Sequence, residues 1–290
     1  MFLWTGPTPD YDGTPDAEVI IHEVTHGTSN RLHGNASGLS TNMSRGMGEG
    51  WGDFYGHALL AEPTDPINGI YTTGGYVTYQ IAAGFTGNYY YGIRRFPKAV
   101  MSFTGGPNNR PHNPLTFADL NAGCDLSDGA FPRGPVGVAQ CDQVHNAGEI
   151  WSSALWEVRS LMVTRLGFTE GTRRALQVVT DGMKLAPLGP TFLQERDAII
   201  AAASALPSAP MAAADVDDVR EGFRIRGMGF SASVQSVSPA VVTEAFDLPN
   251  AQVTNPFSVD DSTGNNNGVP EPGENVLLNV AVINTTGATV

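Results

Sequence analysis

Apolar residues recur at three- and four-residue spacing through the second half of the chain. From Val144 the pattern continues through Leu155, Val158 and Met162, and it predicts a core helix of about 20 residues. Segments rich in proline interrupt the pattern beyond this helix. Between them, further helices are predicted at about 171–185, 190–204 and 211–225. We therefore expect a helical bundle in this part of the protein.

An earlier helix is predicted over residues 15–30. Thr14 is the expected N-cap, and Pro15 suits the first helical position because that position needs no backbone N–H donor. The apolar side that anchors this helix is expected to consist of Ile20, Ile21 and Val24.

A second helix is predicted to begin at Gly46 and to run through His57, although this stretch is rich in glycine. Each glycine disfavours a helix by up to about 1 kcal/mol relative to alanine. We interpret these glycines as positions where the backbone presses closely against the helix at 15–30.

Strand patterns lie near both ends of the chain. Phe2-Leu3-Trp4 predicts an edge strand, whereas residues 61–144 are expected to be largely irregular. Beyond Gly229 the composition shifts to Ser, Val, Thr and Pro, and Val276 to Asn284 predicts a β-strand. These patterns predict an α+β protein, with one domain over residues 1–235 and a partial β-rich domain over residues 236–290.

Composition and charge narrow the classes of function. The 290 residues are 41% hydrophobic and 16% charged, which is typical of a globular protein with a large core. The net charge of −13 makes nucleic acid an unfavourable partner, because the surface repels phosphate. The sequence has no apolar run of about 18 residues, so it predicts no membrane-spanning helix. No signal peptide is visible, and both ends read as cuts, so we expect a fragment.

The stretch His22-Glu23-Val24-Thr25-His26 carries the HExxH pattern of zinc-dependent peptidases. On a helix, His22 and His26 lie one turn apart on one face, with Glu23 beside them. Imidazole nitrogens bind Zn²⁺, and a neighbouring carboxylate can take a proton from a water molecule. The same pattern also arises by chance, so it needs support from elsewhere in the chain.

Support comes from Glu49, which the glycine-rich helix can bring to the metal as a third ligand. Asp53 lies one turn later and is expected to accept the second ring N–H of a zinc-bound histidine. The alternative is a glycine-rich turn with two solvated carboxylates. His145 stands at the start of the helix that begins at Val144, where it is either a cap or a group that faces the cleft.

One pair of cysteines and one pair of arginines each allow two interpretations. Cys124 and Cys141 bracket a loop rich in glycine and proline, and they form either one disulfide or two free thiols. Arg94-Arg95 is a conspicuous basic pair. If it lies near a zinc cleft, an arginine of this pair either binds a substrate carbonyl or makes a structural ion pair.

The segment from Asp260 to Glu274 resembles an EF-hand calcium loop, with Thr263 in place of the first aspartate. An ordinary Asn/Gly/Pro turn before a strand is the alternative, and it is the one we favour. A Ca²⁺ site here is therefore a secondary expectation.

The chain resembles the fungalysin family of secreted zinc metallopeptidases, which are relatives of thermolysin. The matching segments are MFLWTG, AEVIIHEVTHGTSNRL, GMGEGWGDFYGHAL, GIRRFP, VHNAGEIWSSALWEV and DGMKLAPLGPTFLQERDAI, in that order over residues 1 to about 230. The resemblance implies a thermolysin-like fold, of which this chain holds mainly the helical C-terminal part of the catalytic domain. A β-sandwich-like domain is expected to begin after it.

For the site, the resemblance implies His22, His26 and Glu49 as zinc ligands and Glu23 as the catalytic carboxylate. It implies Asp53 as the partner of a zinc-bound histidine, and His145 as a group that stabilises the transition state. Protein or peptide substrates, secretion and an N-terminal propeptide in the precursor are also implied. The tyrosine that binds the oxyanion in thermolysin has no counterpart between His26 and Glu49.

Two alternatives to a zinc endopeptidase stay open. In the first, zinc only holds two helices together in a binding module, although such a site has no use for Glu23 beside the metal. In the second, the chain is inactive because the β-rich N-terminal part of the family's catalytic domain is expected before Met1, so that part of the cleft is missing.

Overall fold

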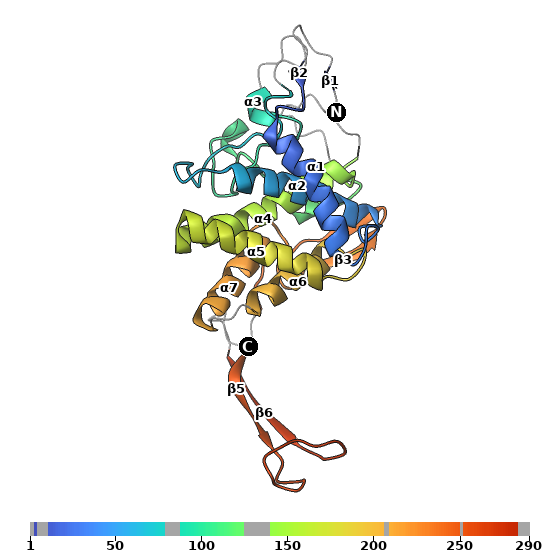
Figure 1. Ribbon diagram of the computed structural model, residues 1–290, viewed down its shortest axis with the longest axis vertical. Coiled ribbons are helices and arrows are strands. Elements are labelled where there is room, and N and C mark those ends of the chain that lie inside the picture. Colours follow the sequence, from blue (N-terminus) through green and yellow to red (C-terminus); the bar gives the residue numbers. More distant parts are fainter. Residues whose placement is uncertain are drawn as a thin grey trace. The chain divides into compact units, whose positions relative to one another are not determined.

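A computed structural model describes residues 3–4, 11–78, 88–124, 140–205, 209–249 and 252–283 (Figure 1). The chain divides into two compact units, Met1–Phe246 and Asp247–Val290. The first unit holds every helix of the described residues, and the second holds a strand hairpin. Small antiparallel sheets beside many helices agree with the predicted α+β class.

Helix α2 lies at the centre of the first unit. It packs against α1 on one side and against α4 on the other, and α4 in turn contacts α5 and α7 (Figure 1). Helix α6 completes the bundle by packing against α5 and α7. The main helices are α1 (Ala17–Leu32), α2 (Asn42–Leu60), α4 (Val144–Leu166), α5 (Phe168–Leu185), α6 (Phe192–Ser204) and α7 (Ala209–Ile225). All the predicted helices are therefore present.

The predicted start of helix α1 is wrong by two residues. Its N-cap is Asp16, whose carboxylate accepts hydrogen bonds from the backbone N–H groups of Glu18 and Val19 at 3.1 and 3.4 Å. The hydroxyl of Thr14 instead donates to Asp12 at 2.6 Å. Both residue types cap helices well, so sequence alone could not choose between them.

The predicted anchor of helix α1 is wrong for two of its three residues, whereas the third, Ile21, is half-buried. Ile20 is 49% exposed and Val24 is 65% exposed, whereas the buried residues of α1 are Thr25 and Ser29. The glycines of α2 lie against His22 and His26 of α1 rather than against this apolar pair. The apolar residues Ile20 and Val24 therefore point away from the bundle.

Helix α2 begins at Asn42 rather than at Gly46, because Thr41 and Ser44 form a reciprocal capping box. The interpretation of its glycines as close-contact positions is confirmed. A Cβ on Gly52 would lie 2.4 Å from His22 Nδ1 on α1. On the opposite side, Cβ atoms on Gly46 and Gly50 would lie 2.6 Å from atoms of α4. The glycines thus allow α1 and α4 to sandwich α2.

The core of the first unit is aromatic. The indole rings of Trp51 and Trp151 meet edge to face with centroids 5.8 Å apart, and Trp151 also contacts Phe192 and Phe223. All four side chains are fully buried. They tie α2 and α4 to α6 and α7, and so they fix the helices that carry the candidate site.

The strands form three antiparallel pairs. In the first unit, β1 (Leu3–Trp4) pairs with β2 (Tyr11–Asp12), and β3 (Ser233–Val237) pairs with β4 (Ala240–Thr243). In the second unit, β5 (Gln252–Asp260) pairs with β6 (Leu277–Ile283). The strands predicted at 2–4 and 276–284 are present as β1 and β6. Phe2 and Asn284, at the outer ends of these predictions, lie outside the described residues.

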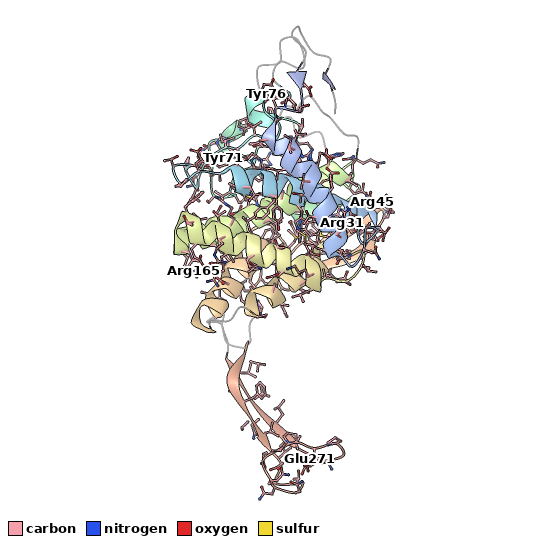
Figure 2. All side chains as sticks on the ribbon, in the orientation of Figure 1. Arg31, Arg45, Tyr71, Tyr76, Arg165 and Glu271 are labelled. Atoms are coloured by element: carbon pink, nitrogen blue, oxygen red, sulfur yellow. A yellow bond between two sulfur atoms is a disulfide. The ribbon has the colours of Figure 1, made fainter. Side chains whose placement is uncertain are left out.

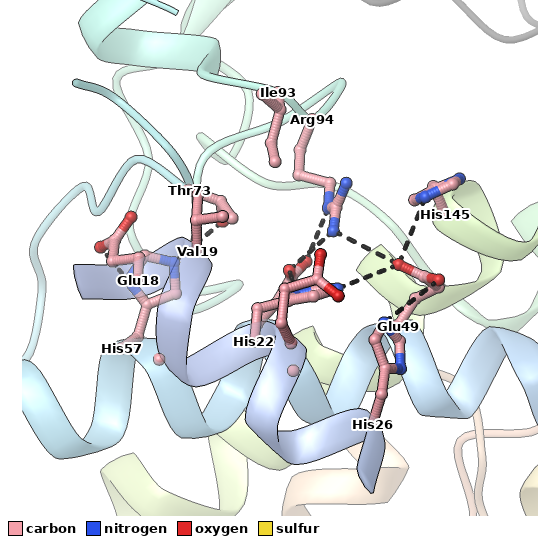
Figure 3. Close-up of a pocket in the computed structure, with 14 residues that line it drawn as sticks. Glu18, Val19, His22, His26, Glu49, His57, Thr73, Ile93, Arg94 and His145 are labelled. Carbon is pink, nitrogen blue, oxygen red and sulfur yellow. Dashed lines mark hydrogen bonds and ion pairs between the residues drawn. The ribbon is translucent and has the colours of Figure 1, made fainter. Parts of the chain in front are cut away.

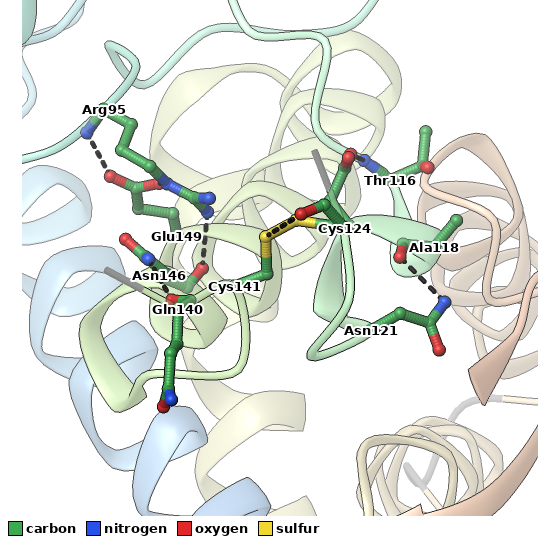
Figure 4. The surroundings of a disulfide bond; sticks show 10 residues. Arg95, Thr116, Ala118, Asn121, Cys124, Gln140, Cys141, Asn146 and Glu149 are labelled. Carbon is green, nitrogen blue, oxygen red and sulfur yellow. Dashed lines mark hydrogen bonds and ion pairs between the residues drawn. A yellow bond between two sulfur atoms is a disulfide. The ribbon is translucent and has the colours of Figure 1, made fainter. Parts of the chain in front are cut away.

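The long segment predicted to be irregular contains only short helices within its described parts. They are α3 (Asn88–Tyr91), η1 (Pro107–Asn109) and η2 (Phe117–Leu120). Cys124 and Cys141 in this segment are joined by a disulfide, with their Cα atoms 5.9 Å apart (Figure 4). Of the two alternatives for these cysteines, the structure therefore has the disulfide.

The loop between β5 and β6 satisfies its acidic side chains internally. Glu271 accepts a hydrogen bond from the side chain of Asn265, and Asp261 accepts one from the backbone N–H of Gly268. Among the described residues of this loop, where Figure 2 labels Glu271, no three histidine, cysteine or carboxylate side chains form a group that could hold a metal ion. The expected Ca²⁺ site has no support, and the alternative of an ordinary turn agrees with these bonds.

Candidate active site

Two helices present three candidate metal ligands to one point. His22 and His26 come from α1 and Glu49 comes from α2, and one ligand atom from each lies within 4.8 Å of the others (Figure 3). His22 Nε2 is 3.2 Å from Glu49 Oε2, and His26 Nε2 is 3.6 Å from Glu49 Oε1. Among the described residues this is the one such group of histidine, cysteine and carboxylate side chains.

The chemistry of this group fits a catalytic zinc ion. Two imidazole nitrogens and one carboxylate oxygen are a common donor set for catalytic zinc, and three protein ligands leave a fourth position for water or substrate. Burial alone would raise the pKa of Glu49, but a hydrogen bond from His22 and the charge of Arg94 lower it. Glu49 is therefore ionised, as a ligand must be.

Asp53 lies behind the ligands, one turn after Glu49 on α2. Its Oδ1 is 3.0 Å from His22 Nδ1, so it can fix the ring with Nε2 turned toward the metal position. Although Asp53 is buried, the charge of Arg94 and the hydrogen bond with His22 hold its pKa well below the usual range. Burial would lower the pKa of His22, but its hydrogen bonds to Asp53 and Glu49 raise it to about 9.

The two neighbouring arginines take different partners. Arg94 is buried and donates both Nε and Nη2 to the carboxylate of Asp53 at 2.7 Å. Arg95 pairs with Glu149 at 2.7 Å and donates to the carbonyl of Asn146, both on α4 (Figure 4). The structural ion pair considered for this motif is thus present, and it holds the residue that orients His22.

Glu23 follows His22 on α1 and lines the same cavity as the three ligands. Its side chain is exposed. Within the described part of the chain its carboxylate has no hydrogen bond or ion pair. It is therefore available to accept a proton from a water molecule at the site.

His145 faces the ligands from the first turn of α4 (Figure 3). Its Nε2 is 3.3 Å from Glu49 Oε2, and its side chain is 46% exposed. The N-cap of this helix is Gln143, which the sequence did not single out. Of the two alternatives for His145, the structure supports a group that faces the cleft.

Gln143 also sets the hydrogen-bonding state of His145. The side-chain oxygen of Gln143 accepts from the backbone N–H of His145 at 2.8 Å, so its amide N–H can donate to His145 Nδ1 at 2.9 Å. Burial lowers the pKa of His145, which favours the neutral ring. A neutral ring that accepts at Nδ1 carries its proton on Nε2, and it can donate that proton toward the cleft.

A cavity of about 310 Å³ runs from the ligands along α1 and α2. Glu18 and His57 lie at its far end, together with Thr73 (Figure 3). The sequence reading missed these residues. Their spacing is nevertheless regular, because Glu18 lies one turn before His22 and His57 lies one turn after Asp53.

A second cavity, of about 510 Å³, also begins at His26 and Glu49. Its wall includes Leu39, Arg45 and Val144. The ligands are therefore reached from two cavities, as expected of a site that acts on an extended molecule.

None of the helices in the described part of the chain combines the length and the apolar character needed to cross a bilayer.

Comparison with known proteins agrees with this geometry. Residues 1–232 match the fungalysin metallopeptidase family (M36). The chain is similar to an extracellular metalloproteinase of Aspergillus terreus, at 32% identity over 86% of this chain and 35% of the relative. It is also similar to an extracellular metalloproteinase of Leptosphaeria maculans, at 33% identity over the same shares. A probable extracellular metalloproteinase 2 of Arthroderma benhamiae is 33% identical over 79% of this chain and 33% of the relative. The chain spans about a third of the length of these relatives.

Proposed function

The chain belongs to the fungalysin metallopeptidase family, and we propose that it is part of a secreted zinc endopeptidase that hydrolyses peptide bonds of proteins. The observation that carries this proposal is the convergence of His22, His26 and Glu49, with the uncommitted carboxylate of Glu23 beside them. The names of the relatives support both the chemistry and the secretion.

His22, His26 and Glu49 would hold the zinc ion. When bound there, Zn²⁺ supplies a Lewis acid that makes water nucleophilic near neutral pH and polarises the scissile carbonyl. Asp53 keeps His22 in the tautomer that presents Nε2 to the metal, and Arg94 keeps Asp53 ionised. These two residues act by positioning a ligand.

Glu23 acts as the general base. It accepts a proton from the attacking water and then delivers that proton to the leaving amine. His145 donates its Nε2–H to the oxyanion that develops on the scissile carbonyl, because Gln143 occupies its other ring nitrogen. The structure thus offers a donor for the oxyanion, although the chain has no tyrosine between His26 and Glu49.

The domain assignment is part of the same proposal. Residues 1–235 correspond to the helical C-terminal part of a thermolysin-like catalytic domain, and residues 236–290 to the start of a β-rich domain. The disulfide between Cys124 and Cys141 fits an oxidising compartment and so supports secretion. A propeptide in the full-length precursor also belongs to this proposal.

The second candidate function is a binding module in which zinc only joins α1 and α2. It is disfavoured because Glu23 and His145 face the metal position without being needed as ligands. Incubation of the protein with casein separates the two functions. A zinc endopeptidase cleaves casein, loses activity with a chelator and regains it with zinc, whereas a binding module contains zinc and cleaves nothing.

A further inference from the structure

The cavity that begins at the metal ligands ends at a fixed carboxylate. Glu18 Oε2 accepts the backbone N–H of Gly74 at 2.8 Å, and Glu18 Oε1 is 3.2 Å from His57 Nδ1. His57 Nε2 lies 3.0 Å from the hydroxyl of Thr73. The ring of His57 therefore bridges Glu18 and Thr73, and it holds the carboxylate of Glu18 in place.

Glu18 can still accept further hydrogen bonds from a ligand. Each of its oxygens has one of these partners, whereas a carboxylate offers about four acceptor positions. Its side chain is 23% exposed, whereas that of His57 is 4% exposed. His57 is therefore the buried support, and Glu18 is the group that meets whatever enters the cavity.

The walls of the cavity between Glu18 and the ligands suit the stem of a long side chain. Val19 and Ile93 are apolar, and Gly52 and Gly56 add no side chain to the floor. Glu18 and His22 are one helical turn apart, which corresponds to about 6 Å along the axis. A lysine or arginine side chain has the length to span this distance while its methylene groups contact apolar walls.

We propose that Glu18 makes this cavity a subsite for a cationic side chain, lysine or arginine, next to the scissile bond. The inference rests on the proposed peptidase function. Arg94 also lines the cavity. Its positive charge does not repel a cationic side chain there, because it is paired with Asp53 at 2.7 Å. A second metal site is not an equal alternative, since Glu18 and His57 supply only two ligands.

The test uses three fluorogenic peptides that differ at one residue, which is lysine, norleucine or glutamate. That residue is placed on each side of the scissile bond in turn, and the cleaved bond is identified by mass spectrometry. At one of these positions we expect the wild-type protein to prefer lysine over norleucine by about tenfold in kcat/KM, or about 1.4 kcal/mol. Glutamate is expected to be the poorest substrate at that position.

Glu18→Gln keeps the shape and the hydrogen bond from Gly74 but removes the charge. We expect the lysine-to-norleucine ratio of kcat/KM to fall to about one in this variant, and Glu18→Lys to reverse the preference toward glutamate. The matched control is Glu62→Gln, which removes an exposed carboxylate just after α2 and should keep the wild-type ratio.

Binding without turnover gives an independent readout. In the Glu23→Gln background, where we expect little hydrolysis, the Kd of the lysine peptide should rise about tenfold when Glu18→Gln is added. Cleavage with the same ratio in wild type and Glu18→Gln would overturn this inference alone. Failure to cleave casein or any of the peptides would overturn the proposed function, and this inference with it.

Discussion

Arg94 and Asp53 form a buried, bidentate ion pair directly behind His22, which is a proposed metal ligand. Both oxygens of Asp53 receive a guanidinium nitrogen of Arg94 at 2.7 Å, while its Oδ1 remains 3.0 Å from His22 Nδ1. One carboxylate therefore compensates a buried charge and orients a ligand at the same time. We therefore expect Asp53 to couple the stability of the protein to the proposed metal binding.

Asp53→Asn should weaken both properties. It leaves the buried charge of Arg94 without its partner, which typically costs about 3–5 kcal/mol of unfolding free energy. It also replaces the charged acceptor that orients His22 with a neutral amide, and changes to such partners lower metal affinity by about 10- to 100-fold. Denaturant unfolding and zinc titration measure the two effects. The exposed Asp217 provides the control Asp217→Asn, and equal behaviour of the two variants would contradict the coupling.

Gly52→Ala should displace His22. The added Cβ would lie 2.4 Å from His22 Nδ1 and 2.6 Å from its Cγ, so the ring or the helix has to shift. Gly56→Ala on the same helix is the matched control, because its Cβ would meet its nearest neighbours at 3.5–3.8 Å. We expect Gly52→Ala to lose zinc affinity. Gly56→Ala should keep zinc and gain about 0.5–1 kcal/mol of stability from its better helix propensity.

Lys98 is buried, and we expect it to make the stability of the protein depend on pH. Burial lowers the pKa of Lys98 to about 8, whereas its value in an unfolded chain is near 10.5. Between these values the folded protein has lost a proton that the unfolded chain keeps, so the free energy of unfolding rises with pH by up to about 1.4 kcal/mol per unit.

Lys98→Met should remove this rise, and Lys184→Met should keep it, because Lys184 is exposed and pairs with Asp181. The measurement is urea unfolding of the three proteins at pH 7.5, below the pKa of Lys98, and at pH 9.5, above it. The same pH dependence in wild type and Lys98→Met would show that Lys98 keeps its proton throughout.

Removal of the disulfide should destabilise the protein and disturb His145. Cys124 and Cys141 are 17 residues apart, and closing a loop of this size stabilises a fold by about 3 kcal/mol. Cys141 lies four residues before His145, next to Asp142, which accepts a hydrogen bond from the backbone of Ala240. The double variant Cys124→Ser/Cys141→Ser should therefore melt at a lower temperature and cleave casein more slowly.

Reduction with dithiothreitol is the matching chemical test. It should lower the melting temperature of the wild-type protein by a similar amount and leave the double variant unchanged. A wild-type melting temperature that does not respond to reduction would contradict the role given to this bond.

The convergence of the proposed metal ligands could be predicted because their spacing follows helix geometry. His22 and His26 are one turn apart on α1, and Glu49 and Asp53 are one turn apart on α2. The glycines of α2 also indicated a close contact, which the structure confirms. Local rules of this kind act within one helix or between two neighbours in sequence.

Other features depended on packing that sequence does not show. Ile20 and Val24 look like an anchor for α1, yet the buried residues of this helix are Thr25 and Ser29. The pairing of Arg94 with Asp53 joins residues 41 positions apart, and no local pattern indicates which carboxylate an arginine meets. Glu18 and His57 carried the same one-turn spacing as the ligands, but they form no known motif.

The most direct test of the proposed function compares Glu23→Gln with His22→Ala. Metal analysis and the rate of casein cleavage are measured for both variants and for the wild-type protein, each loaded with zinc. We predict that Glu23→Gln binds one zinc per chain and cleaves about 100- to 10,000-fold more slowly, because only the proton acceptor is lost. His22→Ala should lose both zinc and activity. Full activity in Glu23→Gln would contradict the account.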